Sequence, residues 1–483
     1  MDARPAGVLF WFRHDLRLHD QPALHRAIAL AQATGGWLLP LYIHDPLWQT
    51  ETVWGFARSS ALRQQWRDMA LHDLRQQLQA LGSDLLQWQG DPVSLLRSLA
   101  LALGEARRAP FAPVLVCEEI AAPEEQAQLA ALRKQGLRLE SVWQSTLMEP
   151  ASLPFAMPQL PDVYSDFRRA LERASVAAAS PLPAPRALPP LPPLPHSVLP
   201  SRLGQAGDTV GEAAGEAAGD TAGDTAGEAM GEAMGAAAVA DNVSSAGSAL
   251  TLFGGLHGGE RAALRHLEQY CQRGLPHSYK QTRNGLSGID YSTKWSPWLA
   301  TGALSPRRAW AEVQALVAQQ GPSEGTDWIR VELLWRDYFR WLHCKYGRRL
   351  YRSSGLRRGS PPRHDAQAFL RWCRGQTGQP FIDAGMRELK ATGYLSNRLR
   401  QNVASYLIHD LACDWRAGAA WFEAQLIDYD VTSNQGNWLY LSGGGTDPRG
   451  SRRFDPQRQA QLYDPDGAYR ARWSQFATED DQR

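Results

Sequence analysis

Cysteine is scarce in this chain of 483 residues, and none of it is spaced for metal binding. The five cysteines are scattered and odd in number, without a CxxC pair or a Cys/His cluster. We therefore expect reduced thiols, a cytoplasmic setting and no protein-bound metal. Long hydrophobic runs are also missing, and the first seven residues lead directly into an expected strand. We expect neither a membrane span nor a signal peptide.

A G-x-G-x-x-G motif is absent after the first expected strand, which argues against the usual dinucleotide fingerprint at that position. The loop there reads R-H-D-L-R-L-H-D over residues 13–20. Its charges fit either a solvated turn or a structural lock, and the sequence leaves both interpretations open.

Basic residues are absent from residues 203–250, which hold eight acidic side chains and a Gly at every fourth position from 207 to 235. Gly once per turn disfavours a helix, and few side chains here can form a core. We expect residues 202–250 to be a disordered acidic linker. They end a linker region, 151–250, whose residues 181–195 alternate Pro with Leu and should be extended. The alternative is an acidic tether that competes with nucleic acid.

The remaining charge is unevenly distributed along the chain. Residues 1–202 carry 19 basic and 19 acidic side chains, whereas residues 251–483 carry 32 basic and 23 acidic ones. The C-terminal half is therefore the candidate surface for a polyanionic partner, although scattered solvated Arg side chains would also explain the excess.

Strand and helix patterns alternate through the first 150 residues. They predict strands at 8–12, 37–43, 84–88, 113–117 and 138–142, and helices at 22–33, 59–81, 92–103 and 123–135. This alternation predicts an α/β domain over residues 1–150, built on a doubly wound parallel five-stranded sheet.

Residues 251–475 are predicted to form an all-helical domain, followed by a short tail at 476–483. Helices are expected at 260–273 and 327–344. Ser296 before Pro297 and Ser305 before Pro306 are typical of helix N-caps. The hydroxyls of Y-S-T-K-W-S (291–296) at a helix N-terminus form a candidate pyrophosphate site, with capping alone as the alternative.

Polar side chains gather again in residues 393–440. Helical spacing places Asn397, Arg400 and Gln401 on one face of a helix with Ser396 as its cap. After an expected turn at 414–416 and a helix at 421–426, the chain continues with Asp428, Asp430, Asn434 and Trp438. This pattern favours a buried polar ligand. The alternative is a buried Arg400–Asp428 pair that only ties two helices together.

The helix expected at 327–344 carries Glu332, Trp335, Arg336 and Phe339 on one face. A carboxylate beside an exposed indole would suit a flat substrate with polar edges. A surface pair between Glu332 and Arg336 is the alternative interpretation.

Five motifs, in this order, resemble the cryptochrome–photolyase family. They are W-F-R-H-D-L-R-L-H-D (11–20), Y-S-T-K-W-S (291–296), E-L-L-W-R-D-Y-F-R (332–340), N-R-L-R-Q-N-V-A-S-Y-L (397–407), and D-W-R-A-G-A-A-W-F-E with L-I-D-Y-D-V-T-S-N-Q-G-N-W-L-Y (414–440). The match covers nearly the whole chain except 175–250. T-R-N-G-L-S-G-I-D (282–290) and D-P-R-G-S-R-R-F-D-P (447–456) resemble the DASH cryptochrome branch.

The resemblance implies a noncovalently bound FAD, bent into a U within the helical domain. The residues implied to hold its phosphates are Tyr279, Ser292, Thr293, Lys294 and Ser296. Those implied to line the isoalloxazine and adenine are Asn397, Arg400, Asp428 and Asp430, while Asn434 would face the flavin N5. A cation beside the ring favours the anionic reduced flavin.

The activity implied by the resemblance is blue-light-driven repair of cyclobutane pyrimidine dimers, chiefly in single-stranded DNA. Reduced flavin would donate an electron, the ring would split, and the electron would return. The implied catalytic residues are Glu332, Trp335, Asn397, Gln401, Trp438 and Tyr440. Trp335 and Tyr440 would stack on the flipped dimer, and a protonated Glu332 would stabilise its radical anion.

The resemblance also implies an electron-transfer chain and an antenna. Trp438 and Trp415 match the inner two tryptophans of the family's chain of three. The outer one is absent from residues 351–370, so either Trp372, Trp341 or Tyr351 replaces it or photoreduction is slow. The antenna of this branch is methenyltetrahydrofolate, for which Glu119 and Glu124 are the candidate ligands.

A blue-light photoreceptor that signals to a partner is the main alternative function, and a nucleic-acid-binding flavoprotein without catalysis is a third. The complete set of Glu332, Trp335, Gln401 and Tyr440 favours repair, as does the lack of a long C-terminal tail. We expect a monomer in the cytoplasm that does not associate with membranes.

Overall fold

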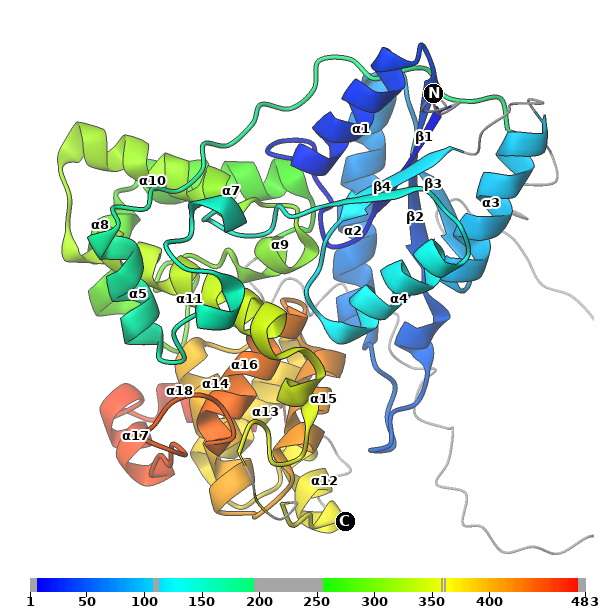
Figure 1. Ribbon diagram of the computed structural model, residues 1–483. Coiled ribbons are helices and arrows are strands. Elements are labelled where there is room, and N and C mark those ends of the chain that lie inside the picture. Colours follow the sequence, from blue (N-terminus) through cyan, green and yellow to red (C-terminus); the bar gives the residue numbers. More distant parts are fainter. Residues whose placement is uncertain (1–6, 107–112, 195–254, 358, 360–361, 477–483) are drawn as a thin grey trace, which may run out of the picture.

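The N-terminal part of the protein is built on one parallel sheet (Figure 1). The computed structural model describes residues 7–106, 113–194, 255–357, 359 and 362–476. The strands are β1 (Gly7–Phe12), β2 (Trp37–His44), β3 (Leu86–Gln89), β4 (Val114–Glu118) and β5 (Leu139–Val142). They lie in the order β3-β2-β1-β4-β5, so Trp11 of the central strand pairs with Leu41 on one side and Cys117 on the other.

Helices cover both faces of this sheet, as predicted for a doubly wound domain. They are α1 (Pro22–Ala33), α2 (Ala61–Ala80), α3 (Pro92–Ala106) and α4 (Pro123–Lys134). Helices α1 and α2 pack on the face that presents Val8, Phe10 and Phe12. Helices α3 and α4 pack on the face of Leu9 and Trp11. Side chains alternate between the two faces of a strand, and both faces are apolar because both are buried.

The C-terminal part of the described chain, from residue 255 on, is built of helices, which confirms the predicted fold class. The helices are α5 (Tyr164–Arg173), α7 (Glu260–Gln272), α8 (Leu275–Thr282), α9 (Ser296–Thr301), α10 (Pro306–Gln320), α11 (Glu324–Tyr346), α12 (Ala366–Arg374), α13 (Pro380–Thr392), α14 (Asn397–His409), α15 (Trp415–Gln425), α16 (Val431–Ser442), α17 (Pro456–Tyr463) and α18 (Ala468–Ser474). None of the helices in the described part of the chain is both long and apolar enough to cross a membrane.

Several helix starts differ from those predicted, and α2 and α11 begin at Ala61 and Glu324 instead of residues 59 and 327. Ser396 and Ser305 cap α14 and α10 as expected, but Ser296 is the first residue of α9 and Trp295 occupies the cap position. The expected turn at 414–416 is wrong, because Asp414 accepts a hydrogen bond from the Arg416 amide and starts α15 at once.

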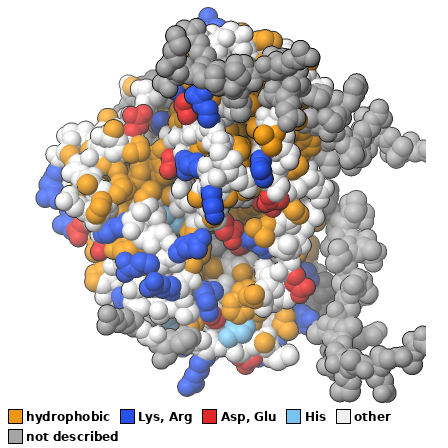
Figure 2. Space-filling model, turned by 45° about the vertical axis from the view of Figure 1, so that its right-hand side comes forward, with side chains coloured by type: hydrophobic (Ala, Val, Ile, Leu, Met, Phe, Trp, Pro, Cys, Tyr) orange, Lys and Arg blue, Asp and Glu red, His pale blue; other side chains and the backbone are white. Residues whose placement is uncertain are grey.

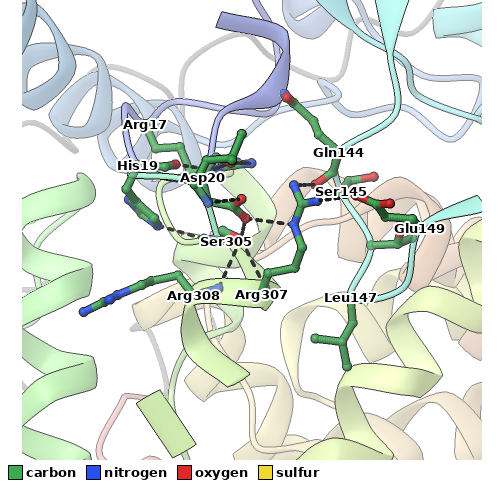
Figure 3. Close-up of polar contacts among 12 residues, drawn as sticks. Arg17, His19, Asp20, Gln144, Ser145, Leu147, Glu149, Ser305, Arg307 and Arg308 are labelled. Carbon is green, nitrogen blue, oxygen red and sulfur yellow. Dashed lines mark hydrogen bonds and ion pairs between the residues drawn. The ribbon is translucent and has the colours of Figure 1, made fainter. Parts of the chain in front are cut away.

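The charged loop at 13–20 is a buried lock between the sheet domain and the helices (Figure 3). The Asp20 carboxylate accepts hydrogen bonds from the Ser305 hydroxyl and from Nε of Arg307, the latter at 2.9 Å. Arg17 donates to the Gly302 carbonyl at 2.8 Å. Asp20 is fully buried and Arg307 is 4% exposed, which excludes the solvated-turn interpretation.

Gly302 allows the two parts to approach this closely. Its φ is +71°, and a Cβ at this position would lie 1.9 Å from the His14 carbonyl oxygen. Only glycine combines this backbone conformation with this contact.

After α5, the Pro-rich segment up to residue 194 contains neither helix nor strand, as predicted. It lies along the sheet domain, where the Leu182 amide donates to Asp20 and the Leu38 amide donates to the Pro190 carbonyl. The predicted acidic linker at 202–250 lies outside the described residues, as do residues 477–483 of the predicted tail.

Candidate functional site

A large cavity lies among the helices of the C-terminal half. It holds about 1960 Å³ of empty space, part of it open to solvent, between segments of α8, α9, α11, α14 and α16. Fifteen side chains selected from the sequence line it together: Tyr279, Ser292, Thr293, Lys294, Ser296, Glu332, Trp335, Asn397, Arg400, Gln401, Asp428, Asp430, Asn434, Trp438 and Tyr440. Residues separated by up to 161 positions in the chain thus form one site.

Lys294 places a buried amino group in the cavity lining. The residue is 5% exposed, and its ammonium lies 3.6 Å from the ring centre of Tyr291 and 4.6 Å from that of Tyr394. Burial lowers the pKa of Lys294 to about 7. An anion beside the ammonium would offset this desolvation. The following helix, α9, has only six residues, so its dipole adds little.

Arg400 and Asp428 form the predicted buried pair. Nη2 of Arg400 donates to Oδ2 of Asp428 at 2.7 Å, and Nε of Arg400 donates to the Leu395 carbonyl at 2.9 Å. The other carboxylate oxygen, Oδ1, is buried and has no hydrogen-bond partner within the described structure. A buried acceptor is rarely left unsatisfied, so this atom fits a donor on a bound molecule.

Asp430 closes the cavity at the start of α16. It accepts hydrogen bonds from the Ser433 amide at 2.9 Å and the Thr432 hydroxyl at 2.7 Å. Burial alone would raise the pKa of Asp430, but Arg340 and Arg336 outweigh it and hold the pKa far below its usual range. The group is therefore a fixed negative charge that anchors two arginines.

Asn434 and Trp438 follow on the cavity face of α16. Nδ2 of Asn434 donates to the Ala419 carbonyl at 3.0 Å, which fixes the orientation of its amide. The indole of Trp438 is 2% exposed and packs so closely on Gly418 that a Cβ there would lie 2.2 Å from the ring. These contacts with α15 fix the positions of both side chains.

Glu332 is already paired in this structure. Its Oε1 accepts hydrogen bonds from Nη2 of Arg283, at 2.5 Å, and from Nε1 of Trp328, at 3.0 Å. Burial raises the pKa of Glu332, and both partners oppose that rise. The surface pair with Arg336 is not formed, because Arg336 instead donates to the Ser145 and Leu299 carbonyls.

Aromatic and amide groups also line the cavity. The Trp335 ring stacks on Tyr164 with centroids 3.6 Å apart and meets Tyr440 edge-on at 6.0 Å. The Tyr440 hydroxyl accepts a hydrogen bond from Arg452 at 2.9 Å. Oε1 of Gln401 accepts one from Arg398 at 3.1 Å.

Further residues line the cavity that the sequence reasoning did not select, among them Arg283, Trp328 and Tyr394. Arg283 stands in the T-R-N-G motif and Trp328 precedes Glu332 by one helical turn. The motif could have identified Arg283. Helical spacing could have identified Trp328, because residues four apart on a helix share a face.

Three candidate residues are not part of this cavity. Trp415 is 4% exposed and its indole donates to the Ser353 carbonyl at 2.9 Å. Glu124 pairs with Arg58 at 3.0 Å, and Glu119 accepts a hydrogen bond from Ser141 at 3.1 Å. The two candidate antenna ligands are thus engaged with different elements.

The positive charge of the C-terminal half is partly neutralised at the surface. Figure 2 shows Lys and Arg side chains over the lower left of one face, with acidic side chains among them. Arg449 pairs with Asp447 at 2.8 Å, and Arg453 pairs with Asp410 at 2.7 Å. Exposed ion pairs of this kind are weak. Their arginines can therefore release the carboxylate and bind a phosphate instead.

Family models match most of the chain. Residues 8–187 match the model described as DNA photolyase, and residues 328–478 match the FAD binding domain of DNA photolyase. The fold and the cavity therefore define a photolyase-type flavoprotein.

Comparisons with individual proteins assign the chain to a branch within this class. The chain is 40% identical to Cryptochrome DASH of Gloeobacter violaceus over 468 residues, which covers 96% of this chain and 85% of that one. It is 37% identical to Cryptochrome DASH of Xenopus laevis, over 96% and 82% of the two chains. A solved Synechocystis cryptochrome superposes with a TM-score of 0.79 at 36% identity, covering 98% of this chain and 89% of that one. The chain belongs to the cryptochrome–photolyase family, in its DASH branch.

Proposed function

We propose that this DASH-type flavoprotein uses blue light to repair cyclobutane pyrimidine dimers, chiefly in single-stranded DNA. One observation carries the proposal: a single cavity is lined both by Lys294 and an unpaired carboxylate oxygen of Asp428 and by Glu332, Trp335 and Tyr440. The first group fits a dinucleotide, and the second offers stacking faces and polar groups for two joined bases.

The residues toward FAD fit the chemistry of that molecule. Lys294, with the hydroxyls of Ser292, Thr293 and Ser296 and the phenol of Tyr279, would hold the phosphates. Oδ1 of Asp428 would accept a hydrogen bond from the cofactor, while Arg400 places a positive charge nearby. Asn397, Asp430 and Asn434 would orient the rings. When bound, FAD supplies light absorption and the electron that splits the dimer.

The residues toward the dimer would bind and polarise it. Trp335 and Tyr440 would stack on the extruded bases, and Asn397, Gln401 and Trp438 would border them. Glu332 would exchange its bond with Arg283 for one with a base edge. Because burial raises the pKa of Glu332, loss of the Arg283 contact would favour the protonated acid that can donate to the reduced dimer.

Electrons would reach the cavity through Trp438, together with Trp415 or Trp372. The Trp372 ring lies 6.5 Å from that of Trp438 and stacks on Phe369 at 6.0 Å. Phe369 lies 6.4 Å from Trp54, which is half-buried. We favour Trp372 because it contacts Trp438 directly, so these rings lead from the cavity wall to the surface without the missing outer tryptophan.

The remaining assignments extend the same proposal. Residues 1–150 and 251–475 would act as the antenna-side and FAD-binding domains on either side of a 151–250 linker. Methenyltetrahydrofolate would bind on the antenna side near Glu119 or Glu124. The protein would work as a monomer in the cytoplasm.

The direct test is light-dependent repair of a thymine dimer in an oligonucleotide, single-stranded against duplex. Glu332→Ala should lower repair at least tenfold while FAD content stays unchanged, because the residue belongs to the group that would bind the dimer. Glu324→Ala, at the exposed start of the same helix, is the matched control. Equal loss of repair and FAD in Glu332→Ala would mean that the residue is structural.

The photoreceptor alternative gives the opposite result in this assay. A pure sensor would bind FAD and respond to blue light, yet would leave the dimer intact in either strand form. Absence of repair with a fully reduced flavin would therefore reject the proposed enzyme.

A further inference from the structure

A second cavity lies directly behind two residues of the proposed dimer site. It contains about 660 Å³ of empty space and is bounded by α11, α16, the start of α5 and the loop at 443–449. Trp335, Phe339 and Tyr440 line both this cavity and the large one. The two spaces are therefore neighbours that share a wall of aromatic rings, and the repair mechanism uses only one of them.

The walls of this second cavity are mainly aromatic and aliphatic. Tyr164 stacks on Trp335, and Tyr338 lies against Tyr164 with centroids 5.7 Å apart. Leu342 and Leu356 complete the apolar lining. Flat apolar walls with a few polar groups at the rim are typical of a site for a small planar ligand.

Polar groups are few and lie where they could meet the edge of such a ligand. The Tyr338 hydroxyl donates to the Asp162 carbonyl and contacts the Thr446 hydroxyl at 3.2 Å. Asp447 and Arg449 also line the cavity, and the Arg449 side chain is 67% exposed. A planar group with polar edges, attached to an anion that stays outside beside Arg449, satisfies this arrangement.

We propose that this cavity is a subsite for the nucleobase next to the dimer in a single strand. The inference rests on the proposed function, since it takes the dimer to lie on the other side of Trp335 and Tyr440. The neighbouring base is the planar group that the strand itself would bring to this wall. Stacking on aromatic side chains is tolerant of sequence, so any base would be accepted.

The subsite accounts for a preference for single strands. In a duplex the neighbouring base is paired and stacked, and it would have to be extruded together with the dimer at an added cost. In a single strand that cost is small, and stacking in the cavity offsets it. The phosphate between the dimer and this base would lie near Arg449 or Arg452, which now hold Asp447 and the Tyr440 hydroxyl.

The test measures dark binding of the FAD-loaded full chain to single strands that carry one thymine dimer. The nucleotide on the 5′ or the 3′ side of the dimer is either intact or replaced by an abasic site. The abasic replacement on one side only should raise Kd about tenfold. A 2-aminopurine at that same position should lose fluorescence on binding.

Leu356→Trp fills the cavity and should abolish the difference between intact and abasic strands while the flavin spectrum is retained. Leu462→Trp, the same change at an exposed position of α17, should keep it. Equal Kd for all strands, with dimers still bound more tightly than undamaged DNA, would overturn the subsite alone. Failure to discriminate dimers from undamaged DNA would overturn the proposed function with it.

Discussion

Lys294 is the residue whose chemistry depends most on what fills the large cavity. Its ammonium faces two tyrosine rings, and burial brings its pKa to about 7. A phosphate beside it would restore the charged form and raise the pKa again. The residue thus couples occupancy of the cavity to proton uptake.

FAD affinity should fall as pH rises above 7. The free protein loses the Lys294 proton near that pH, whereas the complex keeps it. The contribution of the Lys294 charge to the free energy of FAD binding is therefore complete below pH 7 and is lost as the pH rises above 7. We expect Kd to rise by up to about tenfold per pH unit between 7 and 9. Fluorescence titration of the apoprotein measures this, and Lys294→Met should flatten the profile. An unchanged slope in Lys294→Met would assign the pH dependence to another group.

Photoreduction should depend on Trp372. Trp372→Phe keeps the packing but removes the ring that can give up an electron, so we expect the rate of light-driven flavin reduction by an external thiol to fall at least tenfold. Trp88→Phe is the matched control, because Trp88 is buried against the sheet of the N-terminal domain. Equal rates in wild type and Trp372→Phe would mean that Tyr351 is the outer donor of the electron-transfer chain, or that the chain ends at Trp415.

The sequence identified the lining of the cavity better than its internal pairing. Helical spacing placed Asn397, Arg400 and Gln401 on one face, and all three line the same cavity. The bond between Arg283 and Glu332 joins residues 49 apart. No local pattern predicts such a contact, because it depends on how α8 packs against α11.

Helix ends set the orientation of the functional side chains. Ser396 is fully buried and its hydroxyl accepts a hydrogen bond from the Leu399 amide, which fixes the first turn of α14. The Pro and Ser signals at 305–306 and 396 were sufficient to predict two helix starts. The start of α15 was missed although Asp414, which caps it, is of a residue type that favours the N-cap position.

Removing the α14 cap should therefore affect the cavity as well as stability. Ser396→Ala should lower the free energy of unfolding by ~1 kcal/mol, and FAD should bind more weakly because Asn397 and Arg400 lie in the first turns. Chemical denaturation and flavin titration give the two readouts. Asp365→Ala removes the cap of α12, which does not line the cavity, and should leave FAD affinity unchanged. Equal weakening by both variants would contradict the local explanation.

The sheet domain and the helical domain are joined through buried charge. The sequence predicted both architectures from the periodicity of their apolar residues, yet it left the 13–20 loop undecided. The sequence of a charged loop does not show whether water or another domain covers the loop. The covering elements, from Glu260 to Arg307, are more than 200 residues away.

Arg307→Met should destabilise the whole protein. It would leave the fully buried Asp20 without its cation, and breaking such a pair costs about 3–5 kcal/mol. Thermal unfolding followed by tryptophan and by flavin fluorescence should show both signals shifting together. Arg308→Met, at the neighbouring position with 45% side-chain exposure, is the control. A shift confined to one signal would mean that the two domains unfold independently.

Both flanks of the span between residues 195 and 254 are tied to the same part of the sheet domain. Before it, Leu182 is bonded to Asp20. After it, Glu260 accepts hydrogen bonds from the amides of Leu18 and His19. A protease nick anywhere in that span would therefore yield two polypeptides that still migrate as one coloured particle, and only a denaturant would part them.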